Sequence, residues 1–284
     1  MTPWLPEGRT LVAPGRGELF YRRFQHPDPD APTVLLLHGW TASGDLQFFT
    51  AYRALAERCS FLTIDHRGHG RGLRSEHRFE LEDVADDAAA LIEMLGVAPV
   101  IALGYSMGGP ISMLLARRHP DLVRALVVQA TALEWCSSRI ERVRWKTARI
   151  IGPLLRSFAY QRWLRHGLAR LLGTRSPIQA YVPWLSGEMR RNDAQAIVQA
   201  GQALSRYDAR PWASELSKPA VSLITTNDHL VKPRKQRALA EALGAEVREL
   251  AGNHLSAWEH PDEFAAITVE LVELVAAKSS RALI

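Results

Sequence analysis

The chain has 284 residues, of which 47% are hydrophobic and 23% charged. This length and composition suit one large α/β domain, or a core with one inserted subdomain. No run of about 18 apolar residues indicates a membrane-spanning helix, and no basic region followed by an apolar run indicates a signal peptide, so we expect a cytoplasmic protein. Two cysteines, Cys59 and Cys136, are too few for a disulfide framework and fit a reducing compartment.

The formal net charge of +5 is unevenly distributed. Residues 134–210 hold 14 Lys and Arg against 5 Asp and Glu, a net charge of +9, which leaves −4 for the rest of the chain. A basic segment on a mildly acidic body favours an anionic partner, such as a phospholipid surface or an acidic substrate. An arginine-rich solvated face explains the same charges without any partner, and the sequence leaves both interpretations open.

Strands and helices are expected to alternate through the first half of the chain. Two short strands, RTLVAP and ELFYRRF, flank a turn at Gly15–Gly17, and the apolar run TVLLLHG predicts a buried parallel strand. The predicted order then continues with a helix over residues 47–58, a strand in CSFLTIDH, a helix in LEDVADDAAALIEML, a strand in PVIALGY, a helix in PISMLLARR and a strand in RALVVQAT. Such alternation predicts a doubly wound, mostly parallel sheet with helices on both faces.

The alternation stops between residues 134 and 210, where no convincing strand is present and four of the eight tryptophans occur. It resumes with the strand KPAVSLITTND, a helix in RKQRALAEALG, the strand AEVREL and a long helix from about Pro261. We therefore predict an eight-stranded α/β core, residues 1–133 and 211–284, with a helical cap, residues 134–210, inserted after the sixth strand.

The predicted cap carries a basic amphipathic pattern near its start. On a helix, apolar residues such as Ile140 and Val143 would lie beside a basic stripe of Arg139, Arg142, Lys146 and Arg149. Such a stripe packs over an active-site cleft more often than it makes weak contact with a membrane surface, and both remain open. No nucleic-acid-binding motif accompanies the charge, so we predict no nucleic-acid partner.

The segment Gly104-Tyr105-Ser106-Met107-Gly108 matches the pattern G-x-S-x-G. About one chain in ten of this size would contain the pattern by chance, so it is weak evidence alone. Its context is specific, because it lies directly between an apolar strand and a helix. A tight turn at that place lifts the serine hydroxyl clear of the sheet, which favours a nucleophile over an ordinary capping serine.

A serine hydroxyl is a poor nucleophile without a base. His254 follows the last predicted strand and fits the base, and Asp228 follows the strand SLITTN and fits the carboxylate that orients it. The order Ser106, Asp228, His254 is the one this fold uses. Weaker rivals are Asp208 and Glu134 for the acid, and His260 for the base, although a position before Pro261 suits helix capping better.

An oxyanion intermediate requires two backbone donors. We expect the amide of Met107, directly after the serine, and the amide of Trp40, in the loop after LLLHG. Gly39 allows the backbone to approach the substrate closely, while the His38 side chain either faces substrate or only hydrogen-bonds its own loop. The predicted substrate-binding residues are His38, Gly39, Tyr105, Trp135 and Trp184. The ten histidines show no metal-ligand spacing, so we predict no metal and no cofactor.

Five segments together resemble the α/β-hydrolase superfamily in order and spacing. They are LLLHGWTASG, TIDHRGHGRG, GYSMGG, the TTND turn and GNHLSAWEHPDEF, and they cover nearly all of the chain outside residues 134–210. The chain is most similar to capped bacterial serine hydrolases, which include esterases, monoglyceride-type lipases and C–C bond hydrolases. The resemblance implies that Ser106 attacks, His254 relays the proton and Asp228 orients His254. One departure is Gly252-Asn253-His254, where many members have G-x-G-H.

The fold does not fix the substrate. A serine at the nucleophile position argues against the related haloalkane dehalogenases and epoxide hydrolases, which use aspartate there. Ester hydrolysis through an acyl-enzyme on Ser106, with a small to medium acyl or aromatic substrate, is the favoured prediction. A C–C bond hydrolase of an anionic dienone and a non-catalytic binding protein on the same scaffold are the alternatives. The chain is expected to act as a monomer or homodimer on a small-molecule ester.

Overall fold

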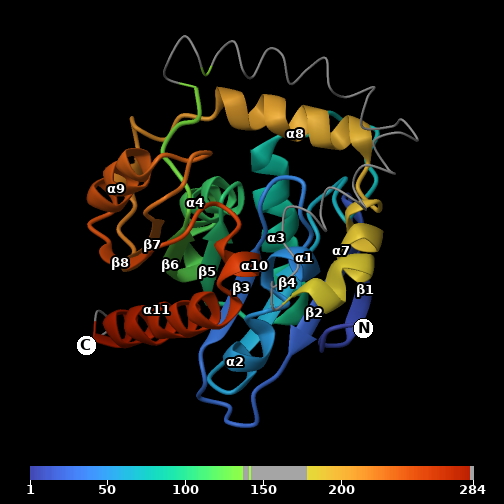
Figure 1. The fold of residues 1–284 in the computed structure, drawn as a ribbon, viewed down its shortest axis with the longest axis horizontal. Coiled ribbons are helices and arrows are strands. Elements are labelled where there is room, and N and C mark those ends of the chain that lie inside the picture. Colours follow the sequence, from blue (N-terminus) through green and yellow to red (C-terminus); the bar gives the residue numbers. More distant parts are fainter. Residues whose placement is uncertain (137–140, 142–177, 282–284) are drawn as a thin grey trace.

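The computed structural model describes residues 1–136, 141 and 178–281 (Figure 1). The eight strands are β1 (Gly8–Ala13), β2 (Gly17–Phe24), β3 (Thr33–Leu37), β4 (Ser60–Ile64), β5 (Val100–Tyr105), β6 (Val123–Gln129), β7 (Ala220–Thr225) and β8 (Glu246–Leu250). They form one sheet in the order β1-β2-β4-β3-β5-β6-β7-β8. β2 pairs antiparallel with β1 and with β4, and every other pair is parallel. The predicted mostly parallel eight-stranded sheet is confirmed.

Helices cover both faces of this sheet. Those of the described residues are α1 (Gly44–Phe48), α2 (Tyr52–Ala56), α3 (Leu81–Leu95), α4 (Gly108–Arg118), α7 (Val182–Met189), α8 (Ala194–Arg206), α9 (Pro233–Ala242), α10 (Ser256–Glu259) and α11 (Pro261–Arg281), with short 3-10 turns at Pro120–Leu122, Gln179–Tyr181 and Ala213–Glu215. One buried cluster joins the sheet to α3, α4 and α9, and a second joins its other face to α1, α2 and α11. Every residue of β5 is buried, because a parallel strand covered on both faces reads as a continuous apolar run.

The helix predicted over residues 47–58 is wrong in its extent. The Ser43 hydroxyl accepts a hydrogen bond from the Leu46 amide, and this cap starts α1 at Gly44. The chain then turns after Phe48 and begins α2 at Tyr52. Two short helices therefore replace one, and the first carries residues 44–48 close to the carboxyl end of β3.

The chain leaves the core after β6 and returns before β7. Glu134 and Asp208 form an isolated antiparallel bridge where the intervening segment departs and returns. Its described part contains α7 and α8, and Figure 1 shows α8 lying across one end of the fold, above α3 and α4 in that view. The predicted basic stripe of Arg139, Arg142, Lys146 and Arg149 lies outside the described residues. Within the described part of the chain, none of the helices has the length and hydropathy that crossing a membrane requires.

Candidate active site

Ser106 lies on a sharp turn between β5 and α4. Its backbone has φ 53°, a left-handed conformation that a residue with a side chain rarely adopts. The flanking glycines make the turn possible. A Cβ on Gly104 would collide with the Gly108 carbonyl, and a Cβ on Gly108 would collide with the Leu37 carbonyl. The sequence G-x-S-x-G is therefore the steric condition for a serine held in this strained position.

Ser106, His254 and Asp228 form a continuous hydrogen-bonded chain. His254 Nε2 lies 2.8 Å from Ser106 Oγ, and His254 Nδ1 lies 2.7 Å from Asp228 Oδ2. Because a carboxylate can only accept a hydrogen bond, Nδ1 carries the proton and donates the hydrogen bond to Asp228. Nε2 is then the basic nitrogen, and it accepts the hydrogen bond of the Ser106 hydroxyl. The predicted base and acid thus meet the predicted nucleophile, although 148 residues separate Ser106 from His254.

Asp228 is held as a carboxylate by donors on both oxygens. Oδ1 accepts from the amides of Leu230 and Val231 at 2.8 and 2.9 Å, and Oδ2 accepts from Thr225 Oγ1 at 2.9 Å as well as from His254. Burial favours the neutral form, but the hydrogen bond and charge of His254 and the amide of Val231 outweigh it, so the pKa of Asp228 lies below its usual range. The carboxylate is therefore ionised at neutral pH.

The two rival acids are engaged elsewhere. Asp208 pairs with the neighbouring Arg210 on the surface, and Glu134 pairs with Lys235 at 3.0 Å. The rival base His260 lies directly before α11, where its carbonyl accepts from the Phe264 amide. None of the three takes part in the hydrogen-bonded chain that contains Ser106.

The loop that carries His254 is fixed at two points. The Tyr105 hydroxyl donates to the His254 carbonyl at 3.0 Å, and Asn253 Oδ1 accepts from the Leu255 amide at 2.7 Å. Tyr105 is fully buried, which raises the pKa of its phenol and keeps it protonated as a donor. The asparagine that departs from the G-x-G-H pattern thus makes a local turn of its own.

The loop from His38 to Thr41 passes directly beside Ser106. A Cβ on Gly39 would lie 3.3 Å from Ser106 Cβ, closer than side chains usually approach, so glycine lets the loop pass this near to Ser106. His38 Nδ1 donates to the Gly39 carbonyl at 2.8 Å. That carbonyl and the Trp40 amide belong to one planar peptide unit, so the bond fixes the plane of the predicted oxyanion donor. Met107, the second predicted donor, begins the turn into α4.

The segment between α7 and α8 holds the same loop from its other side. Asn192 Nδ2 donates to the carbonyl of Thr41 at 2.7 Å, and Thr41 has φ 66°. The Trp40 indole donates to the Ile197 carbonyl in α8 at 2.8 Å. The loop that carries the Trp40 amide is therefore held by residues both of the core and of the inserted segment.

Three buried imidazoles, His38, His66 and His69, lie behind this loop and are called the histidine cluster below. His38 Nε2 accepts from the His66 amide at 3.0 Å, while His66 Nε2 lies 3.1 Å from the His38 carbonyl and His69 Nδ1 lies 3.0 Å from the Arg67 carbonyl. Burial lowers all three pKa values, that of His66 to about 3, that of His69 to about 4, and that of His38 well below its usual range. All three rings are therefore neutral at pH 7.

A cavity of about 260 Å³ opens at Ser106 and His254. Gly39 and Tyr105, two of the predicted substrate-binding residues, lie in its lining. Its described lining is mostly apolar, with Trp40, Leu46, Met189, Leu230, Leu255 and Trp258. The polar side chain of Gln47 also lies there. These apolar side chains and Gln47 come from segments far apart in the chain. Of them, the sequence analysis singled out only Trp40.

Three predicted substrate-binding residues do not lie in this lining. His38 is fully buried, because its ring is used to hold the loop. Trp135 is buried in the core cluster on the α3 and α4 side. Trp184, in α7, packs edge-on against Phe49 with 5.2 Å between ring centroids. Tryptophan buries much apolar surface, and both rings fill packing positions.

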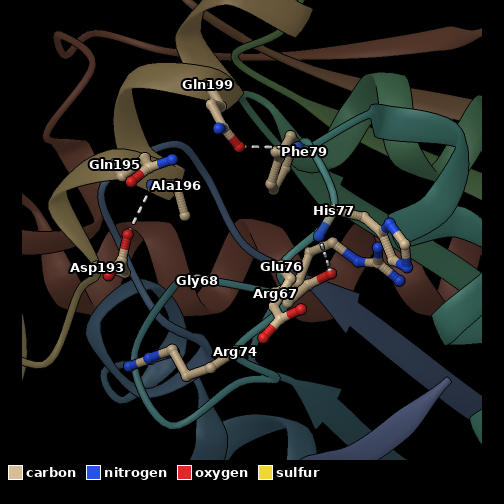
Figure 2. A pocket seen from close by; sticks show the side chains of 11 residues that line it. Arg67, Gly68, Arg74, Glu76, His77, Phe79, Asp193, Gln195, Ala196 and Gln199 are labelled. Carbon is tan, nitrogen blue, oxygen red and sulfur yellow. Dashed lines mark hydrogen bonds between the residues drawn. The ribbon is translucent and has the colours of Figure 1, made fainter.

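A second cavity, of about 210 Å³, lies between residues 67–79 and the start of α8. Figure 2 shows the side chains that line it. Three of its charged side chains, Arg67, Arg74 and Asp193, already have partners. Arg67 pairs with Asp87 through two bonds of 2.8 Å, and Arg74 donates to backbone carbonyls. Asp193 caps α8 by accepting from the Ala196 amide at 2.8 Å. The residues that form the Ser106 hydrogen-bonded chain are absent from this lining.

Within residues 1–136, 141 and 178–281, no group of three or more His, Cys, Asp or Glu side chains could hold a metal ion. The histidine cluster is no exception. His38 Nδ1, His66 Nε2 and His69 Nδ1 face backbone carbonyls, whereas His66 Nδ1 and His69 Nε2 are buried without a hydrogen-bond partner among the described residues.

A serine, a histidine and a buried aspartate joined in this way are the arrangement that serine hydrolases use. Residues 32–261 match the family described as the alpha/beta hydrolase fold, and the chain belongs to that family. A pimeloyl-[acyl-carrier protein] methyl ester esterase of Neisseria meningitidis serogroup C is 28% identical over 252 residues, 86% of this chain and 95% of that protein. A 2-(acetamidomethylene)succinate hydrolase of Mesorhizobium japonicum is 33% identical over 116 residues, 38% of this chain and 41% of that protein.

Solved structures of other hydrolases share the fold. The enol-lactonase of Burkholderia xenovorans LB400 aligns with a TM-score of 0.78 at 23% identity, covering 93% of this chain and 100% of that chain. The esterase EaEST of Exiguobacterium antarcticum aligns with a TM-score of 0.80 at 17% identity, covering 94% of this chain and 100% of that chain. At these identities the likeness shows the fold and leaves the substrate to be argued from the site.

Proposed function

We propose that the protein is a serine esterase that cleaves a carboxylic ester through an acyl-enzyme on Ser106. The observation that carries the proposal is the unbroken hydrogen-bonded chain from Ser106 Oγ through His254 to Asp228 Oδ2, with bonds of 2.8 and 2.7 Å. This arrangement supports Ser106 as the nucleophile, His254 as its base and Asp228 as the group that fixes the base in the correct tautomer.

In the first half-reaction, His254 Nε2 takes the hydroxyl proton of Ser106 as Oγ bonds to the ester carbonyl carbon. The carbonyl electron pair moves to oxygen, and the amides of Trp40 and Met107 are the proposed donors to that oxyanion. The imidazolium is stabilised by ionised Asp228, whose lowered pKa keeps its charge in place. His254 then gives its proton to the departing alkoxide oxygen as the carbon–oxygen bond breaks, which leaves acylated Ser106.

In the second half-reaction, His254 takes a proton from water as the water oxygen bonds to the acyl carbon. The oxyanion forms again and collapses, the bond to Ser106 Oγ breaks, and Oγ recovers the proton from His254. The products are a carboxylic acid, an alcohol and the free enzyme.

The substrate we propose is small to medium and largely apolar. The cavity of about 260 Å³ is near the lower end of the range for ligand pockets, roughly 300 Å³ and above. Its described lining contains no Asp, Glu, Lys or Arg side chain. Relatives named as methyl ester esterases, matched over 86% of this chain, support an ester of an acyl chain. An anionic dienone is less well supported, because no Lys or Arg lies in the described lining to pair with it.

We also propose that residues 134–210 form a cap over this cavity. Two observations support the cap. The Glu134–Asp208 bridge joins the two ends of the inserted segment, and Met189 at the end of α7 contributes to the cavity lining. The cap would then take part both in substrate contact and in holding the Trp40 loop.

A panel of p-nitrophenyl esters from acetate to palmitate tests the proposal, run beside a p-nitroanilide and a dienone C–C substrate. We expect the highest kcat/KM among short to medium acyl chains, with no turnover by Ser106→Ala. Preferential cleavage of the dienone or the anilide would contradict an esterase, and Asp208→Asn is a matched control that should leave the rates unchanged.

A further inference from the structure

Gln47, the fourth residue of α1, places an uncharged amide in the cavity at Ser106. The residue is 8% exposed and contributes to the cavity lining. Within the described part of the chain, its side-chain amide makes no hydrogen bond. Neither amide atom is among the described side-chain atoms that are shielded from solvent without a partner, so the amide is accessible from the cavity. An unpaired amide directed at a ligand cavity is therefore a candidate contact for the ligand.

The amide lies close to the reacting atoms. The position that a Cβ on Gly39 would occupy lies 3.2 Å from Gln47 Oε1 and 3.3 Å from Ser106 Cβ. The Gln47 amide and the nucleophile thus flank the same point of the Gly39 backbone. The scissile carbonyl must lie at Ser106, and Gly39 lies between Ser106 and Gln47. A substrate group that hydrogen-bonds Gln47 would therefore lie close to the scissile carbonyl.

The partner that fits Gln47 is neutral. Asp45, its acidic neighbour in α1, is already paired with Arg22 through bonds of 2.6 and 2.8 Å. No Lys or Arg lies in the described lining, so the described residues offer a carboxylate or phosphate beside Gln47 no permanent counter-charge. A primary amide offers both donors and an acceptor, and its natural partners are another amide, a hydroxyl or a second carbonyl.

We propose that Gln47 is a specificity-determining residue that hydrogen-bonds a neutral polar group next to the scissile carbonyl. The preferred substrate class is then esters whose acyl part carries an acylamino, hydroxyl or keto group one or two atoms from the reacting carbon, with an apolar remainder. This inference rests on the proposed esterase function and adds to it the chemistry of the substrate.

Two methyl esters of equal chain length test it, N-acetylglycine methyl ester and methyl pentanoate. The acetamido group both donates and accepts, so it can pair with Gln47 in either orientation of the amide. Gln47→Met keeps the length and approximate volume of the side chain but cannot make this bond. We expect the variant to lower kcat/KM for the acetamido ester about ten-fold and to leave that for methyl pentanoate unchanged or slightly raised.

Met189→Leu is the matched control, since it alters the apolar lining of the same cavity and should affect both esters alike. Labelling of Ser106 by an alkyl phosphonate verifies that each variant is folded, and Gln47→Leu replaces Gln47→Met if the latter does not fold. Equal losses for both esters, or an unchanged ratio, would overturn the specificity role while leaving the esterase function intact. Failure of the wild-type protein to cleave either ester would contradict the proposed function and this inference with it.

Discussion

Asp228→Asn should abolish most activity without unfolding the protein. Oδ1 accepts from the backbone amides of Leu230 and Val231, so the side-chain oxygen of an asparagine would remain there and its NH₂ group would replace Oδ2. That NH₂ group would face His254 Nδ1, where it donates instead of accepting. His254 would then carry its proton on Nε2, toward Ser106, and could no longer accept the serine proton.

The corresponding change in the chymotrypsin-type triad lowers kcat about 10⁴-fold, which is about 5 kcal/mol of transition-state stabilisation. We expect a loss of that order in kcat for a p-nitrophenyl ester. The melting temperature should change little, because Oδ1 keeps its two backbone partners. Asp208→Asn, at the rival carboxylate, serves as the control and should retain wild-type kcat. A kcat for Asp228→Asn within ten-fold of wild type would refute the reasoning, because another group would then orient His254.

Two further predictions concern stability. Glu188 in α7 is buried and accepts two hydrogen bonds, of 2.7 and 2.8 Å, from Arg71 in the core. Glu188→Ala removes this partner and should lower the free energy of unfolding, measured by urea titration, by about 3 kcal/mol. A loss below about 0.5 kcal/mol would contradict this. The lowered pKa values of the histidine cluster keep its three rings neutral in the folded protein. Below about pH 6.5 the unfolded chain therefore binds more protons than the folded chain. The free energy of unfolding should fall as the pH is lowered from about 6.5 to about 4, by up to about 1.4 kcal/mol per pH unit for each ring. Asp65 opposes this effect in part, because burial and the charge of Asp45 raise its pKa to about 6. His69→Asn should make the free energy of unfolding depend less on pH. A free energy of unfolding that is constant over this range would contradict neutral buried histidines.

The sheet could be predicted from the sequence because its central strands are buried on both faces. Such strands are continuous apolar runs that end at glycine or polar loops, and VIALGY and TVLLL show this directly. The order of Ser106, Asp228 and His254 could be predicted for a related reason. Each follows the carboxyl end of a parallel strand, and those ends meet at one edge of the sheet.

The cavity could not be predicted in the same way. Leu46, Met189, Leu230 and Trp258 line it from four separate segments, and no local pattern marks side chains that meet only through tertiary packing. His38 also resembles a substrate-facing residue in sequence, because it precedes the glycine beside Ser106. Its burial depends on His66, 28 residues away, whose backbone amide donates to it.

The chemistry of the Gln47 position illustrates the same limit. Glutamine is usually solvated, and nothing in the sequence marks this one as different. Only the approach of the Gly39 backbone to both Gln47 and Ser106 shows that its amide belongs to the cavity.

The most direct test of the central claim is covalent labelling of Ser106. After reaction with a p-nitrophenyl alkylphosphonate, intact-mass measurement should show one adduct per chain, and peptide mapping should locate it on Ser106. The adduct should be absent from folded Ser106→Ala. A folded wild-type protein that takes up no label, or an adduct that persists in Ser106→Ala, would contradict the assignment of Ser106 as the nucleophile.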